Sequence, residues 1–202
     1  MPPHRRAFFA RDAVVVAREL VGATIAAPGV RLRITETEAY KWPGDTACHA
    51  RSGRTARNAA LWGPPGRAYV YTCYGLHQLL NLVTGEDGMA QAVLIRACEV
   101  IEGLDLVCAR RKAPPGPTLL AGPGKVGQAL AVDPSMSHRS VLRGGRLWVG
   151  PGTPPRALLA GPRVGIDYAD PADRRRPWRF ADADSPAVTV RRTLRPWRPD
   201  GG

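Results

Sequence analysis

The segment from Leu32 to Tyr40 constrains the fold most strongly, because it places carboxylates on the apolar face of a β-strand. Alternate side chains of a strand share one face, and here that face carries Leu32, Ile34, Glu36, Glu38 and Tyr40. A carboxylate on a buried face is unfavourable unless a partner neutralises it or a reaction uses it. The pattern predicts a general base or a metal ligand on this strand. The alternative is a register slip near the strand end, which would leave both glutamates in solvent.

The chain then supplies side chains that suit a binding site for a flat, hydrogen-bonding ring. A β-prone run at residues 69–75 contains three of the five tyrosines, and an apolar run at residues 92–95 ends in an arginine. Aromatic rings, an imidazole, an amide and a guanidinium can together grip such a ring beside an anionic backbone. The candidates are His49, Tyr69, Tyr71, Tyr74, Asn81 and Arg96.

The strongly basic composition indicates a polyanionic partner. The 202 residues carry a formal net charge of +12, and the 29 basic residues include three lysines, Lys41, Lys112 and Lys125. An excess of this size is typical of proteins that bind nucleic acid. Composition alone leaves two alternatives open: a basic protein without such a partner, or an arginine bias that reflects only a GC-rich genome.

The cysteines and the N-terminal residues bear on the compartment. Cys48, Cys73, Cys98 and Cys108 form no C-x-x-C pair, so no zinc site of that spacing is predicted, and we expect reduced core cysteines. The N-terminal residues lead into no apolar segment typical of a signal peptide, and no run reaches membrane-spanning length. We therefore expect a cytoplasmic protein that is neither secreted nor bound to a membrane.

Hydrophobic patterns and turn residues predict one α+β domain over residues 1–202, with frayed ends at residues 1–7 and 192–202. Helices are expected at residues 13–20, where Asp12 can cap the first turn, and at residues 55–61, 102–112 and 122–131. Strands are expected at residues 23–27, 30–38, 67–74, 79–83, 92–98, 146–149, 163–166 and 187–190. Strands dominate without a βαβ rhythm, which predicts a curved, largely antiparallel sheet with surrounding helices.

Several short motifs occur in a characteristic order along the chain. The strand motif Glu36–Tyr40 precedes His49 and the tyrosine block Tyr69–Gly75. Further motifs are Phe8–Arg11, Arg57-Asn58, Asn81, Val93–Arg96, Gly122-Pro123 with Lys125, Gln128–Leu130, Arg163–Gly165 and Pro177–Phe180. In these motifs the chain resembles the 3-methyladenine, or alkyladenine, DNA glycosylase family.

The resemblance implies a monofunctional DNA glycosylase of base excision repair. Such an enzyme flips an alkylated purine, for example 3-methyladenine, out of duplex DNA and hydrolyses the N-glycosidic bond, which leaves an abasic site. Glu38 would be the general base that activates water, and Arg96 and the main chain near Val164 would hold that water. No cofactor and no metal is implied. These motifs offer no pocket lysine for a Schiff-base lyase step.

The resemblance also implies how the flipped base is held. Tyr40 would stack on one face of the base, and His49 and Tyr71 would lie on the other face. The backbone N–H of His49 would bond to the base edge. Asn81 would crowd the exocyclic amino group of guanine and so select against normal purines.

Two further residues would contact the DNA outside the base pocket. Tyr74 would wedge into the duplex gap that the flipped nucleotide leaves, because a tight turn at Gly75 would expose its ring. Lys125 would contact phosphates from a glycine-rich helix start. The implied partner is double-stranded DNA that contains alkylated purines, bound by a monomer.

Two other classes of protein stay open from the residues alone. A metal-dependent nuclease could use Glu36, Glu38, Asp45 and His49 as ligands of a hard cation. A non-catalytic RNA-binding or ribosome-binding module could use exposed tyrosines as stacking platforms. A nuclease would lose activity in a chelator, and a stacking module would not need Glu38 on an inward face.

Overall fold

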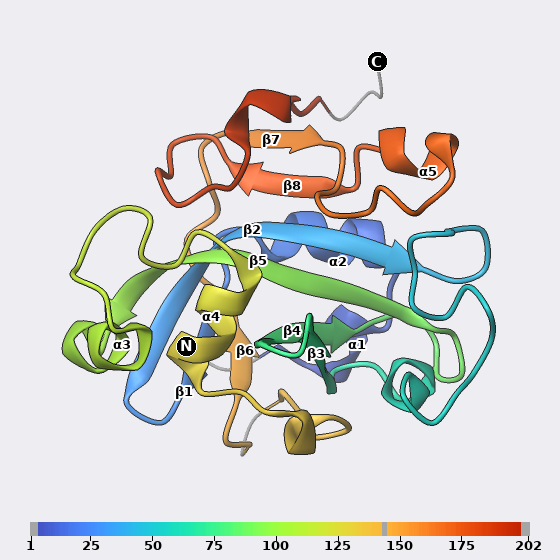
Figure 1. Ribbon diagram of the computed structural model, residues 1–202, viewed down its shortest axis with the longest axis horizontal. Helices are drawn as coiled ribbons and strands as arrows, with labels where there is room; N and C mark the ends of the chain where they lie inside the picture. The colour runs from blue at the N-terminus through green and yellow to red at the C-terminus, as the bar shows by residue number, and fades with distance from the viewer. Residues whose placement is uncertain (1–3, 143–144, 199–202) are drawn as a thin grey trace.

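An antiparallel sheet of nine strands forms the centre of the computed structural model, which describes residues 4–142 and 145–198 (Figure 1). The main path of the sheet runs in the order β3-β4-β5-β2-β8-β7-β9, and β1 pairs with both β2 and β6. The predicted α+β class with a largely antiparallel sheet is confirmed. The strands are β1 Thr24–Ala27, β2 Val30–Lys41, β3 Ala68–Cys73, β4 His77–Val83, β5 Gln91–Glu102, β6 Trp148–Gly150, β7 Leu158–Gly161, β8 Arg179–Asp182 and β9 Arg195–Pro196.

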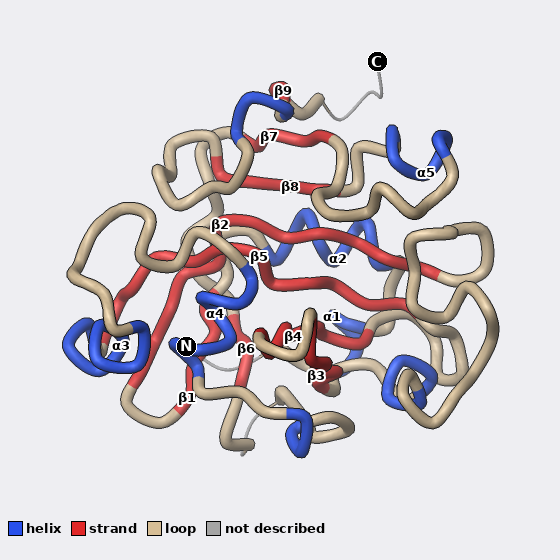
Figure 2. Tube along the Cα trace, viewed as in Figure 1, coloured by secondary structure: helices blue, strands red, loops and turns tan. Residues whose placement is uncertain are grey.

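Short helices surround the sheet, and α2 lies along β2 (Figure 2). The Asp12 side chain accepts a hydrogen bond from the Val14 N–H at 2.8 Å, which explains why α2 begins where the sequence predicts. No helix among the described residues is long and apolar enough to cross a membrane. The α-helices are α1 Arg6–Phe9, α2 Ala13–Leu20, α3 Leu104–Arg111, α4 Pro123–Leu130 and α5 Pro171–Arg175, and 3₁₀ turns span Ala59–Trp62, Pro134–Met136 and Arg191–Thr193.

Along β2, the set of alternate residues that faces the apolar core changes between Ile34 and Thr37. Ile34 pairs with Cys98 and Thr37 pairs with Ile95, but the register is interrupted between these two pairs. Ile34, Cys98 and Ile95 all lie in the core. The Thr37 hydroxyl donates to the Ala17 carbonyl of α2 at 2.7 Å, so Thr37 faces the same side. Strict alternation would place residues 34 and 37 on opposite sides, so the irregularity re-aims the side chains that follow it.

This change corrects the face predicted from the sequence. Leu32 and Ile34 face the core, whereas Glu36 and Glu38 face the opposite side of the sheet, where their partners lie. The prediction of one shared face was wrong, because a backbone irregularity at Thr35 and Glu36 is invisible to residue alternation. Glu36 and Glu38 are both fully buried, so the alternative of solvated glutamates was wrong as well.

Two predicted strands are loops, and three observed strands, β7, β8 and β9, were not predicted. Residues 163–166 and 187–190 form no strand, while β7 and β8 do. The backbone N–H groups of Val164 and Thr189 donate to the Glu38 and Glu36 carboxylates, each at 2.8 Å, instead of to a neighbouring strand. Gly165 has a φ of +77°, which also ends extended backbone there.

The helix predicted at residues 55–61 is shorter than expected. Only the 3₁₀ turn Ala59–Trp62 forms, because the Asn58 side chain replaces helical hydrogen bonds upstream of it. The Asn58 amide oxygen accepts from the Thr55 N–H at 2.7 Å, and its nitrogen donates to the His49 carbonyl at 3.0 Å. Asn58 thereby fixes the backbone of a predicted site residue.

The chain ends are more ordered than the expected frayed segments 1–7 and 192–202. The His4 N–H donates to the Val149 carbonyl at 2.9 Å, and α1 begins at Arg6. Near the other end, β9 pairs with β7 and Leu194 is buried. This buried leucine and the strand pairing hold the segment against the sheet. The remaining parts of the expectation, at residues 1–3 and 199–202, lie outside the described residues.

Candidate active site

A cavity of about 480 Å³ opens on the face of β2 and β5 that carries Glu36 and Glu38, beside the β3–β4 hairpin. Side chains from β2, β3, β4 and β5 line it, together with the loops after β2 and β7. Glu38 does not line the cavity, but it accepts a hydrogen bond from Tyr40, which does. Lys125 is on α4 and lies outside the cavity. The sequence-predicted residues that line the cavity are Tyr40, His49, Tyr69, Tyr71, Tyr74, Asn81, Arg96 and Val164.

Glu38 is a buried carboxylate held by three donors. Its Oε1 accepts from the Val164 N–H at 2.8 Å and lies 3.3 Å from Nη1 of Arg96. Its Oε2 accepts from the Tyr40 hydroxyl at 2.8 Å. Hydrogen bonds from charged and polar donors stabilise a negative charge that burial would otherwise make costly. The carboxylate is therefore fixed in one orientation at the edge of the cavity.

Glu36 lies on the same side of the sheet but is bound differently. Arg179, itself fully buried, donates to Glu36 Oε1 at 2.8 Å, and Arg96 approaches the same oxygen at 3.5 Å. The Thr189 N–H donates to Glu36 Oε2 at 2.8 Å. Arg96 thus lies between the two glutamates and couples their positions. Neither glutamate lines the cavity, but the donors of Glu38 do, whereas Arg179 and Thr189 do not, which indicates a structural part for Glu36.

The aromatic part of the cavity is built from β3 and from the loop after β2. The rings of His49 and Tyr71 lie 4.4 Å apart at an interplanar angle of 72°, and Tyr69 stacks beside Tyr71 with ring centroids 5.6 Å apart. His49 Nδ1 and the Tyr69 hydroxyl are 2.9 Å apart. Burial, together with the charges of Arg57 and Arg51, lowers the pKa of His49, so its neutral form is favoured at neutral pH.

Arg163 supports the cavity from behind, and the sequence motif that contains it gave no role for it. Its guanidinium makes two hydrogen bonds of 2.7 Å to Asp45 and one of 2.9 Å to the Ala39 carbonyl. The same group lies 4.7 Å from the centroid of the Tyr40 ring. This arrangement places the Val164 N–H against Glu38 and backs the Tyr40 ring with a neutralised ion pair.

The same contacts engage the side chains that were considered as metal ligands of a nuclease. Glu36 is paired with arginines, both Asp45 oxygens are bound by Arg163, and His49 Nδ1 is bound to Tyr69. Within residues 4–142 and 145–198, no group of three or more His, Cys, Asp or Glu side chains is arranged to hold a metal ion.

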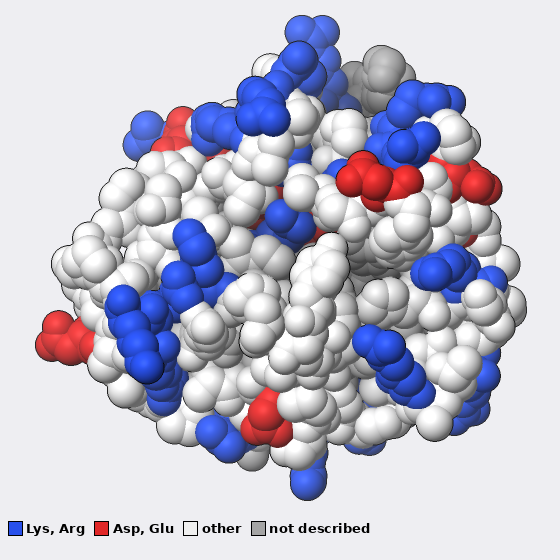
Figure 3. All heavy atoms as spheres, in the orientation of Figure 1, with Lys and Arg blue, Asp and Glu red and all other residues white. Residues whose placement is uncertain are grey.

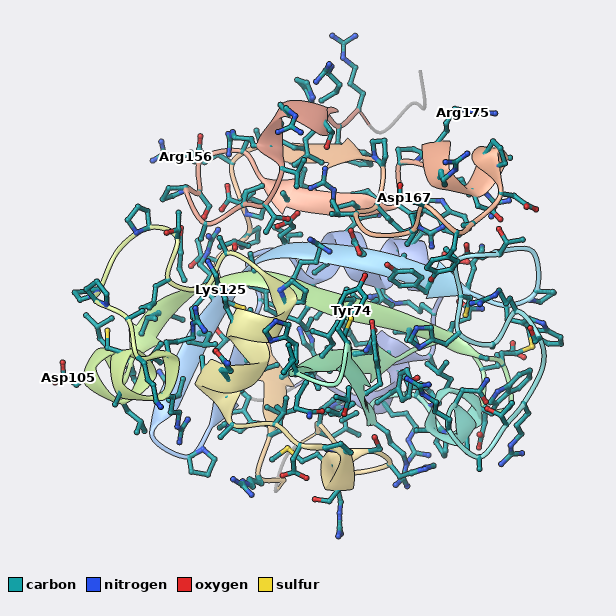
Figure 4. The ribbon with its side chains drawn as sticks, viewed as in Figure 1. Tyr74, Asp105, Lys125, Arg156, Asp167 and Arg175 are labelled. Carbon is teal, nitrogen blue, oxygen red and sulfur yellow. The ribbon has the colours of Figure 1, made fainter. Side chains whose placement is uncertain are left out.

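The β3–β4 hairpin presents an aromatic ring to solvent beside the cavity. Tyr74 and Gly75 have φ angles of +50° and +70°, and the Leu76 N–H donates to the Cys73 carbonyl at 3.1 Å, which closes a tight turn. The Tyr74 side chain is 88% exposed, which agrees with the predicted exposure of this ring. Figure 4 shows Tyr74 near the middle of the face that Figure 1 views.

Basic side chains surround this face. Figure 3 shows lysine and arginine side chains spread over this face and around its rim, with fewer acidic side chains among them. Lys125 lies to one side of Tyr74 (Figure 4), where its Nζ donates to the Thr118 carbonyl at 3.0 Å. An exposed tyrosine among these basic side chains suits the backbone of a nucleic acid around a displaced base.

A buried, hydrogen-bonded carboxylate beside an aromatic cavity, with an exposed aromatic ring on a basic face, defines an enzyme of the class that acts on bases of nucleic acids. Comparison with known proteins narrows this class. A sequence model of the family described as methylpurine-DNA glycosylase matches residues 7–186. The chain belongs to the methylpurine-DNA glycosylase family, whose members are hydrolases that cleave N-glycosyl bonds. The resemblance read from the sequence motifs is confirmed.

Individual relatives match over nearly the whole chain. A Nitrosococcus oceani protein named as a 3-methyladenine DNA glycosylase is 58% identical over 97% of this chain and 96% of its own length. The DNA-3-methyladenine glycosylase of Arabidopsis thaliana is 46% identical over 97% of this chain and 77% of its own length. A Methanocella arvoryzae protein named like the first is 45% identical over 95% of this chain and 98% of its own length.

Proposed function

We propose that this protein removes alkylated purines, 3-methyladenine among them, from double-stranded DNA by hydrolysing the N-glycosidic bond. The observation that carries the proposal is the buried Glu38 carboxylate, fixed by Val164, Arg96 and Tyr40 at the edge of an aromatic cavity. Family membership and the names of the relatives support the same reaction and the same substrate class. The product is DNA with an abasic site.

In this proposal Glu38 is the general base. It takes a proton from water as the water oxygen attacks C1′ of the flipped nucleotide, and it stabilises the positive charge that develops on the sugar. An alkylated purine such as 3-methyladenine is already cationic, so it leaves as a neutral base without a strong general acid. Arg96 and the main chain at Val164 hold the carboxylate, and through it the water, in position.

The aromatic residues bind the flipped base. Tyr40 stacks on one face of the purine and His49 with Tyr71 lies against the other, so that π faces surround a cation. Neutral His49 avoids repulsion of that cation, which fits the lowered pKa of its imidazole. Asn81, held by its bond to the Tyr69 carbonyl at 3.2 Å, crowds the amino group of guanine.

Tyr74 and Lys125 engage the duplex. Tyr74 fills the gap from which the nucleotide is flipped, where stacking of a base on an aromatic ring contributes roughly 1–3 kcal/mol. Lys125 contacts phosphates beside it. A single chain supplies every residue of this site, so we propose that the protein acts as a monomer, in the compartment that holds the chromosome.

The test uses duplex DNA that carries one alkylated purine, incubated with the protein in EDTA and then divided into samples with and without mild alkali. We expect strand breaks only after alkali, because base loss leaves an alkali-labile abasic site. Strand cleavage without alkali, or activity that EDTA abolishes and Mg²⁺ or Mn²⁺ restores, would favour the nuclease instead. Among the described residues that line the cavity there is no lysine, so no lyase product is expected.

A further inference from the structure

Tyr40 makes a contact that base stacking does not require. Its ring lines the cavity, and the Arg163 guanidinium lies 4.7 Å from the ring centroid. Its hydroxyl donates to Oε2 of Glu38 at 2.8 Å. One side chain therefore touches both the place of the flipped base and the carboxylate that acts on water. Stacking alone would be served equally well by phenylalanine.

The hydrogen bonds distinguish the two oxygens of Glu38. A carboxylate has about four lone-pair positions, two on each oxygen. Among the described residues, Oε1 is approached by two donors, the Val164 N–H and Nη1 of Arg96. Oε2 accepts from one, the Tyr40 hydroxyl. The oxygen with capacity to take a proton is therefore Oε2, and the Tyr40 hydroxyl decides which of its two lone-pair directions stays open.

We propose that the Tyr40 hydroxyl is a positioning group that aims the open lone pair of Glu38 Oε2 at the nucleophilic water. This inference rests on the proposed function, in which Glu38 is the general base. In the reaction, a water O–H proton passes to Oε2 and the water oxygen bonds to C1′. The C1′–N bond breaks, and its electron pair stays with the cationic purine, which leaves neutral. A base stacked on Tyr40 restrains the ring and, through the hydroxyl, the carboxylate.

The charged groups around Glu38 determine how the carboxylate should respond when the Tyr40 hydroxyl is removed. Arg96 and Val164 would continue to donate to Oε1, so the carboxylate would keep its ion pair. Oε2 would lose a hydrogen bond that favours the charged carboxylate and fixes its orientation. The titratable or charged groups that face Glu38 or its arginine partner are Glu36 and Tyr40 of β2, Arg96 of β5, Arg179 of β8, Arg163 of the loop after β7 and Tyr71 of β3.

The test is Tyr40→Phe, which keeps the stacking ring and removes only the hydroxyl. In single-turnover excision of an alkylated purine from duplex DNA, we expect the rate constant to fall about tenfold. The acidic limb of its pH profile should move to higher pH. The Kd for DNA that carries an uncleavable lesion analogue should stay within about twofold. A melting curve of each variant shows that the fold is kept.

The matched control is Tyr168→Phe, which removes the hydroxyl of another cavity tyrosine. The Tyr168 hydroxyl donates to the Ala47 carbonyl at 2.8 Å and is not bonded to Glu38. This variant should keep the wild-type acidic limb. If Tyr40→Phe also keeps the wild-type limb and rate, or if it loses lesion binding instead of rate, the positioning role is wrong.

Glu38→Gln in the same assay separates this inference from the proposed function. Excision by Glu38→Gln at the wild-type rate would overturn the assignment of the general base, and the inference with it. An inactive Glu38→Gln beside a Tyr40→Phe variant with the wild-type pH profile would overturn the inference alone. An inactive Glu38→Gln beside a slower Tyr40→Phe variant with a shifted limb supports both.

Discussion

The floor of the cavity and the tip of the β3–β4 hairpin are built on opposite principles. The floor is the buried layer directly beneath the cavity lining, where Glu38, Glu36, Arg96 and Arg179 hold one another in a network of ion pairs. At the tip, Tyr74 is 88% exposed on a tight turn. A fixed charge network suits chemistry that needs a group aimed at one atom. An exposed ring suits insertion into a partner that is not yet bound.

Substitutions at the floor and at the tip should therefore have different effects on excision and on stability. Changes at the floor should alter the chemical step or the stability of the fold, and they should do so whatever the state of the DNA. Changes at the tip should leave stability alone and should alter only the steps in which the duplex is opened.

The largest effect is expected from Glu38→Gln. The amide keeps the shape of the side chain but cannot take a proton from water, so excision should fall by about a thousandfold or more. Affinity for lesion DNA should stay within a few-fold, because the aromatic cage is intact. Single-turnover excision and equilibrium binding, measured side by side, check this. Near-normal excision would show that Glu38 is not the base.

Glu36→Gln should change stability more than chemistry. It removes one charge from a buried cluster and leaves Arg179 without its closest carboxylate, which should cost about 3 kcal/mol in the free energy of unfolding. Denaturant unfolding measures this cost. The same substitution at Glu102, whose ion pair with Arg31 is exposed, is the control and should cost no more than about 1 kcal/mol. Equal costs at both positions would show that the buried network contributes little.

Much of this cavity is predictable from the sequence, because local chemistry determines several of its parts. The turn at Tyr74-Gly75 and the capping of α2 by Asp12 follow from residue types at short range. The carboxylates of β2 are buried, as expected, but on the face of the sheet opposite to the predicted one. The partners of these groups could not be predicted. Arg179 lies 143 residues from Glu36 in the chain, so only the folded sheet brings them together.

The missed parts of the backbone share one physical cause. The change of face in β2 and the loops at residues 163–166 and 187–190 depend on backbone groups that bond to buried side chains. Residue alternation describes regular ladders, so it assigned strands where Val164 and Thr189 donate to carboxylates instead. Arg163 was missed as a support for a different reason, because its partner Asp45 is 118 residues away in the chain. The sequence signal for these contacts was the presence of charged residues on the apolar face of a predicted strand.

At the hairpin tip, Tyr74→Ala should leave the melting temperature nearly unchanged, because the side chain is 88% exposed. Excision from fully paired duplex should fall by roughly tenfold to a hundredfold, which corresponds to about 1–3 kcal/mol of lost stacking. Tyr74→Phe is the matched control and should recover most of the loss, since the ring and not the hydroxyl is the wedge. A marked drop in melting temperature would identify Tyr74 as a structural residue.

The smallest effect concerns His49 and pH. Burial and the charges of Arg57 and Arg51 lower the pKa of His49, so the folded protein resists protonation of this ring. Stability should therefore fall as pH decreases through the ordinary histidine value of about 6.5. His49→Gln should make the free energy of unfolding less dependent on pH between 7 and 5. Some dependence should stay, because burial also lowers the pKa of His4.

The most direct test of the whole account compares floor and tip on two substrates. Single-turnover excision by Glu38→Gln and by Tyr74→Ala is measured on one lesion in paired duplex and on the same lesion in single-stranded DNA. We expect Glu38→Gln to be equally defective on both substrates. Tyr74→Ala should be strongly defective on paired duplex and nearly normal on single-stranded DNA, where no stack must be opened. Equal defects of Tyr74→Ala on both substrates would contradict this division between chemistry and flipping.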